Sequence, residues 1–139
     1  MNKMRNLLAS RTKPVFAAYL IFLVGIITSI VFLITDGADR TFSMGCFLCV
    51  VIGSVVGLAD ILIHLRGMLI FAAALSYVAG VGFHLYAALP SLSDLWNHVN
   101  FIGGNQSAAL VFGTIYIVLT AGLIVINFFS LSKPQEKKA

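Results

Sequence analysis

Four long runs of apolar residues, each without a charged side chain, constrain this chain more than any other feature. The runs cover residues 15–35, 41–59, 67–90 and 108–129. An α-helix rises 1.5 Å per residue, so about 20 apolar residues cross the roughly 30 Å hydrocarbon core of a bilayer. Strands of a membrane barrel would instead alternate apolar and polar residues. The runs therefore predict four membrane-spanning helices.

The composition supports this fold class. Sixty per cent of the 139 residues are apolar and 10% are charged, whereas about a quarter of the residues in soluble domains are charged. We predict an all-α integral membrane protein, a four-transmembrane-helix antiparallel bundle. The expected segments are a basic N-terminus at 1–14, spans at about 15–35, 41–65, 67–90 and 107–130, and a tail at 131–139.

The basic residues predict how the bundle is oriented. Most of them lie at the two ends of the chain, in Lys3, Arg5, Arg11, Lys13, Lys133, Lys137 and Lys138. Arg66 lies in the second connection, whereas the third connection has no Lys or Arg. Because basic flanks tend to stay in the cytoplasm, we expect both termini there, in a cell membrane of the bacterial inner-membrane type. The net charge of +4 is thus assigned to orientation and not to nucleic-acid binding.

The connections carry signals of their own. Asp39 or Thr41 is expected to cap the second helix, and Pro90, which lacks an amide hydrogen, is expected to end the third. The outer loop at 91–107 has apolar residues at helical spacing, which predicts a short interfacial helix with Trp96 at headgroup depth. Asn105 or Ser107 is expected to cap the fourth helix.

Small residues recur every four positions along the second helix. The stripe consists of Gly45, Cys49, Gly53 and Gly57, and the third helix offers Ser76 and Gly80 at the same spacing. Such stripes let helix backbones approach closely in lipid. Two interpretations stay open: packing within one bundle, or packing against a second copy or a larger membrane protein.

Asp60 and His64 are the candidate proton- or ion-handling pair. They lie one helical turn apart, so the carboxylate can accept a hydrogen bond from the imidazole. Ionisable groups within a span are costly and are usually paired or functional. The pair is therefore expected either to fix the hairpin between the second and third helices together with Arg66, or to take part in proton or ion movement.

Two further groups of residues have reactive side chains. Cys46 and Cys49 form a C-x-x-C near the outer side of the second span, which admits a thiol oxidoreductase, although small apolar thiols also suit a packing stripe. His84, Asp94 and His98 have no familiar metal-site spacing, and we expect His84 to bond to loop backbone near the interface. We predict no metal and no cofactor.

No phosphate-binding loop, catalytic triad or metalloprotease motif is present. The sequence therefore favours a non-enzymatic accessory or assembly subunit, which packs in the lipid bilayer as a homo-oligomer or against a larger membrane protein. The alternative is a small oligomeric proton- or ion-coupled transporter or channel that uses Asp60 and His64.

Overall fold

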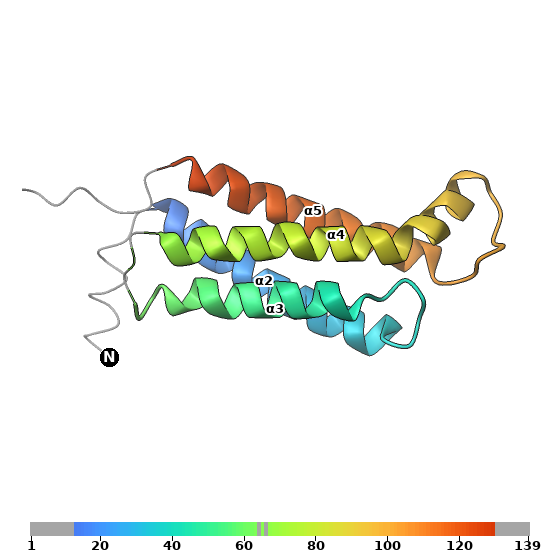
Figure 1. The fold of residues 1–139 in the computed structure, drawn as a ribbon, viewed down its shortest axis with the longest axis horizontal. Coiled ribbons are helices and arrows are strands. Elements are labelled where there is room, and N and C mark those ends of the chain that lie inside the picture. Colours follow the sequence, from blue (N-terminus) through green and yellow to red (C-terminus); the bar gives the residue numbers. More distant parts are fainter. Residues whose placement is uncertain (1–12, 64, 66, 130–139) are drawn as a thin grey trace, which may run out of the picture.

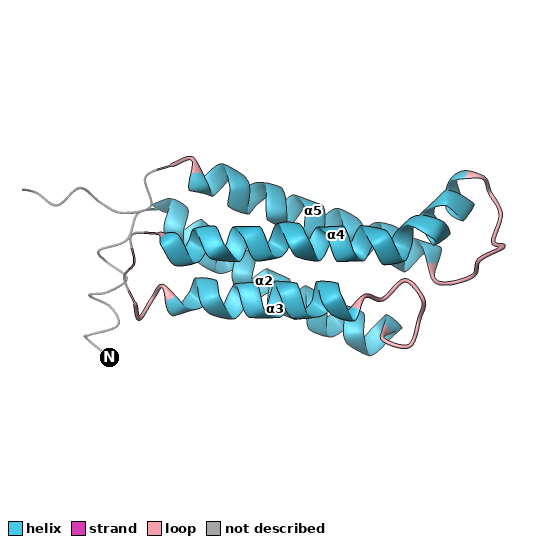
Figure 2. Ribbon diagram, viewed as in Figure 1, coloured by secondary structure: helices cyan, strands magenta, loops and turns pink. Residues whose placement is uncertain are grey.

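The computed structural model describes residues 13–63, 65 and 67–129, and these residues contain four α-helices and no strand. The helices are α2 (Lys13–Asp36), α3 (Met44–Ala59), α4 (Met68–Trp96) and α5 (Gln106–Asn127). Figure 1 shows them side by side and roughly parallel to one long axis. The connections gather at the two ends of the helices (Figure 2).

Each helix packs against its neighbours in the chain, and α5 closes the ring against α2. α2 and α4 therefore lie at opposite corners, with α3 and α5 between them (Figure 1). Short connections between consecutive helices make them antiparallel, as expected of an up-down-up-down bundle. The predicted all-α fold is confirmed, and α2, α4 and α5 are long and apolar enough to cross a membrane.

α3 is shorter than the predicted span at 41–65. It has 16 residues and begins after Ser43, whose hydroxyl accepts a 3.2 Å hydrogen bond from the backbone N–H of Cys46. The expectation that Asp39 or Thr41 caps this helix was wrong, because both belong to the preceding turn. Beyond Ala59, residues 60–63 form turns whose backbone N–H groups bond to carbonyls near the end of α3. The last of these hydrogen bonds joins Ile63 N–H to Ala59 O at 2.9 Å.

The prediction that Pro90 ends the third helix was also wrong. α4 continues through Pro90 to Trp96, so residues 91–96 are the last part of α4 and not a separate helix, and their location at a membrane interface stays a prediction. The C-terminal end of α4 is inclined to the rest of the helix (Figure 1), as a proline kink produces. Two buried side chains fix this end: Ser91 donates to Gly103 O at 2.9 Å, and Asp94 accepts from Ile102 N–H at 2.7 Å.

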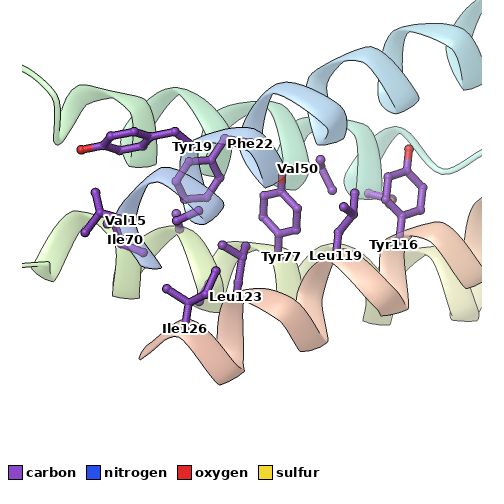
Figure 3. Close-up of a cluster of buried hydrophobic side chains, with 14 of the residues drawn as sticks. Val15, Tyr19, Phe22, Val50, Ile70, Tyr77, Tyr116, Leu119, Leu123 and Ile126 are labelled. Atoms are coloured by element: carbon purple, nitrogen blue, oxygen red, sulfur yellow. The ribbon is translucent and has the colours of Figure 1, made fainter. Parts of the chain in front are cut away.

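The core lies along the bundle axis, where side chains from all four helices meet (Figure 3). Its largest fully buried side chains include Phe22, Phe32, Tyr77 and Tyr116. Helical glycines make room for them: a methyl group at Gly25 would overlap the hydroxyl of Tyr77, and one at Gly57 would overlap the ring of Phe22. The core thus pairs large aromatic side chains with positions that have no side chain, which gives the dense packing typical of protein interiors.

Candidate functional site

The small-residue stripe of α3 faces the inside of the bundle. A Cβ at Gly53 would lie 2.9 Å from Ser76 Cβ and 3.3 Å from the carbonyl oxygen of Ala73, both on α4. Gly57 faces Phe22 of α2. A large side chain at Gly53 or Gly57 would therefore separate helices of this chain, so substitutions there report on the fold and not on assembly.

The N-terminal half of the stripe, at Gly45 and Cys49, also packs closely against α4. The ring of Phe83 lies over Gly45, where a Cβ would be 2.8 Å from Phe83 Cγ. At Gly80 of α4, an added Cβ would lie 3.3 Å from Cys49 Cβ. Ser76 donates a 2.7 Å hydrogen bond to the backbone carbonyl of Cys49. These contacts hold α3 and α4 at close range along the length of α3.

Asp60 lies where α3 ends, and it is only 1% exposed. The hydroxyl of Tyr19 on α2 donates to Asp60 Oδ2 at 3.1 Å. A negative charge at the C-terminal end of a helix is opposed by the helix dipole, and burial adds a desolvation cost. The hydrogen bond from Tyr19 offsets part of this cost and joins α2 to the end of α3. The expected partner, His64, lies outside the described residues, so the Asp60–His64 pair stays a prediction.

Two more tyrosine hydroxyls are bonded inside the bundle, and sequence reasoning missed them. Tyr77 of α4 lies 2.7 Å from Ser54 Oγ of α3, and Tyr116 of α5 lies 3.2 Å from Ser29 Oγ of α2. Buried tyrosines usually find a hydrogen-bond partner. The sequence does hold a signal, since each of these tyrosines lies in the interior of a long, largely apolar run.

The expectation that His84 bonds to loop backbone was wrong, because its side chain is buried between helices. It is 1% exposed, and its Nε2 lies 3.0 Å from the backbone carbonyl of Ala109 on α5. A carbonyl only accepts, so Nε2 donates the proton in this hydrogen bond. The ring centroids of Phe32 and Tyr116 each lie 5.7 Å from that of His84. The residues that the structure describes contain no group of three or more potential metal ligands.

Cys46 and Cys49 are both free thiols. Cys46 is 1% exposed and belongs to the core, whereas Cys49 is partly buried beside α4. Both therefore occupy packing positions in this structure. The buried thiol of Cys46 is inaccessible to an exchange partner in this structure, and the thiol-oxidoreductase hypothesis stays a prediction.

The two connections at the end of the bundle away from Lys13 and Asn127 are joined by hydrogen bonds into one unit, which we call the outer cap (residues 36–43 and 97–105). Asn105 donates from its side chain to Asp36 at 2.8 Å and from its backbone to Asp39 at 3.1 Å. Arg40 donates to the carbonyl of Ile102 at 3.0 Å. Asn105 also accepts from Ala108 N–H and so caps α5, as the sequence predicted.

Asp39 is the centre of this cap. Its carboxylate accepts hydrogen bonds from the backbone and the hydroxyl of Thr41, at 2.9 and 2.8 Å. The backbone N–H of Thr41 is the largest influence that lowers the pKa of Asp39 below its usual value, and partial burial opposes it. Hydrogen bonds to the charged form of a carboxyl group have this effect.

We expect the outer cap to be acid-sensitive through Asp39. Because the pKa of Asp39 is lower in the folded state, its stabilising effect is complete above the unfolded pKa of about 3.9. That effect is lost as the pH falls through the folded pKa. The melting temperature of the purified protein should therefore fall less between about pH 5 and pH 2.5 in Asp39→Asn than in the wild type. Equal acid sensitivity of both proteins would contradict this role.

The outward side of α4 differs from the outward sides of the other helices. Among its exposed residues, one line with alternating steps of four and three positions consists of Met68, Ala72, Leu75, Ala79, Gly82, Tyr86 and Leu89, which we call the α4 face; Phe71, Val78 and Phe83 are exposed beside it. Three of these seven are Ala or Gly. In α2, α3 and α5 most exposed residues are Leu, Ile or Val. Examples are Leu20, Ile27, Ile34, Ile52, Val55, Val118 and Val125.

The surface is also hollowed along α4. One hollow of about 470 Å³ is lined by Ala79, Gly82, Phe83 and Tyr86. Two others lie between α4 and α5, one of about 230 Å³ beside Leu75 and one of about 590 Å³ beside Trp96. A Cβ at Gly82 would meet nothing within 4 Å, whereas at every other helical glycine that the structure describes it would meet a neighbouring residue.

Trp96, the predicted interfacial anchor, is the last residue of α4 and is 86% exposed.

Comparison with known proteins finds no matching family model, no similar curated protein and no similar solved structure.

Proposed function

We propose that this protein is a four-span membrane subunit without enzymatic activity, which packs within the bilayer against itself or a larger membrane protein. The observation that carries this proposal is the α4 face, with its small residues and its hollow beside Gly82. Helix association in lipid is driven by close packing and favours small residues at the contact. The other small-residue stripe, on α3, is already used inside the bundle.

Four spans are consistent with the dimensions of the bundle. α3 and the turn that follows it cover residues 44–63, about 30 Å at 1.5 Å per residue if the turn keeps a helical rise. The basic ends of the chain support cytoplasmic termini, which puts the outer cap on the opposite side. There, the part of α4 beyond Pro90 would lie in the outer interface, and the exposed ring of Trp96 suits headgroup depth.

Gly82→Leu tests the proposal. A leucine at this open position is compatible with the bundle but fills the hollow, so it should block close approach of a partner helix. We expect the variant to insert and melt like the wild type, while the assembly recovered from native membranes in mild detergent falls at least tenfold. Mass spectrometry and light scattering of the eluate measure this loss.

Val118→Leu, on the lipid-facing side of α5, is the matched control and should leave assembly intact. Wild-type assembly in Gly82→Leu would contradict the proposal. A lower melting temperature in Gly82→Leu would show that this substitution changes the fold. Assembly would then be measured with Gly82→Ile, provided that this variant melts like the wild type.

A second candidate function is proton or ion movement through Asp60 and His64. The observation that favours it is the buried Asp60 carboxylate, which bonds to Tyr19 near the cytoplasmic end of the proposed bundle. Buried acids in membrane helices commonly mark proton or ion pathways. Four short helices enclose little space, so such a function would need an oligomer.

Asp60→Asn tests this candidate. Wild-type protein in liposomes should show a proton- or cation-dependent flux, and Asp60→Asn should reduce it at least tenfold because the amide carries no charge. Asp36→Asn at the outer end is the control and should retain the flux. No flux with the wild type, or equal flux with Asp60→Asn, would exclude a role for this carboxylate in transport.

A further inference from the structure

We propose that the hollow beside Trp96 binds one phospholipid of the leaflet on the outer-cap side. The acyl chain of this lipid lies against Leu92, Leu95 and Leu110, and its phosphate accepts a hydrogen bond from the ring of His98. This inference rests on the four-span placement in the proposed function and adds a ligand to it.

The hollow is held open by the fold. It has a volume of about 590 Å³ and lies between Leu110 of α5 and the end of α4 beyond Pro90, which is inclined to the rest of that helix (Figure 1). The buried side chains of Ser91 and Asp94 bond to the following loop at 2.9 and 2.7 Å and so hold this end of α4 in place. The hollow is therefore a fixed feature of the bundle.

The surroundings of the hollow favour lipid as its occupant. Its walls continue the outward sides of α4 and α5, two helices that are long and apolar enough to cross a membrane. An unfilled hollow on such a surface loses dispersion contacts. A straight partner helix does not follow the angle between the end of α4 and α5, whereas a flexible acyl chain does.

The lining of the hollow has the polarity of a membrane lipid. Leu92, Leu95 and Leu110 form an apolar wall, and His98, at the end nearest the loop, is the one ionisable residue among the described residues that line it. Trp96 beside it is 86% exposed, and tryptophan favours headgroup depth. Because an imidazole N–H can donate to a phosphate oxygen, His98 is placed for the headgroup of the lipid whose chain fills the hollow.

The backbone of His98 gives independent support. Its φ of 55° lies in the left-handed region, and no other non-glycine residue of the described chain has a positive φ. The N–H groups of His98 and Val99 bond to Leu95 O and Asp94 O at 3.1 and 3.0 Å, which is a Schellman motif with His98 at the position that glycine usually occupies. A side chain there is unfavourable for the backbone. A contact with a headgroup accounts for a histidine at this position.

Quenching of Trp96 fluorescence tests the inference, because Trp96 is the only tryptophan of the chain. The protein in detergent micelles is titrated with phosphatidylglycerol whose acyl chains carry bromine, a short-range quencher. We expect saturable quenching by one lipid per chain. Brominated diacylglycerol, which lacks the phosphate, should bind about fivefold more weakly, the loss expected of one hydrogen bond. Equal binding of the two lipids would contradict the headgroup contact.

His98→Gly separates lipid binding from stability. The affinity for phosphatidylglycerol should fall about fivefold, while the melting temperature stays the same or rises because glycine suits the left-handed position. His98→Asn tolerates that position and keeps a donor, so it should retain most of the affinity. In the wall, Leu110→Asn should weaken binding, whereas Val118→Asn, at an exposed position of α5 outside the hollow, should not.

Two outcomes would overturn the inference in distinguishable ways. Quenching that rises with lipid without saturation, or equal affinity in His98→Gly, would show only general contact with lipid, so the inference would be wrong and the four-span placement would stand. Absence of Trp96 quenching in vesicles of brominated phosphatidylglycerol and phosphatidylethanolamine would place this end of the bundle outside the bilayer. Both the inference and the placement of this end would then be wrong.

Discussion

The absence of water in the hydrocarbon interior is the constraint on which the rest of this structure depends. Backbone polar groups in the hydrocarbon core must be hydrogen-bonded within the protein, and a buried polar side chain without a partner is costly. Here the hydroxyls of Tyr19, Tyr77 and Tyr116 bond to Asp60, Ser54 and Ser29 on neighbouring helices. These hydrogen bonds join α2 to the end of α3, α3 to α4, and α5 to α2.

Close packing is the second consequence of that solvent. Lipid tails are as apolar as the side chains they replace, so helices gain by fitting together closely and not by leaving water. The glycines of α2 and α3 provide this fit by accommodating Tyr77, Phe22 and Phe83. Gly82 does not fit this pattern, since no residue of the described chain lies over it. We infer that the same packing rule is satisfied there by another helix.

The sequence predicted the helices because an apolar run without charge has few alternatives in a membrane. It also predicted that Asn105 or Ser107 caps α5, and Asn105 does so through a local contact. It failed at Pro90, where a helix survives because Ser91 and Asp94 are held by a loop further along the chain. The burial of His84 and the tyrosine–serine pairs depend on which helices become neighbours. Such long-range contacts leave no periodic signal in one sequence.

Labelling with a photoactivatable lipid tests most directly whether another helix covers the α4 face in the membrane. The probe reacts with side chains that contact acyl chains, and peptide mass spectrometry locates the products. On this account, Leu75 and Tyr86 are labelled at least fivefold less than Ile27 of α2 and Val118 of α5, although all four are more than half exposed in the isolated chain. Equal labelling of the four positions would show that lipid covers α4, and would contradict assembly through this face.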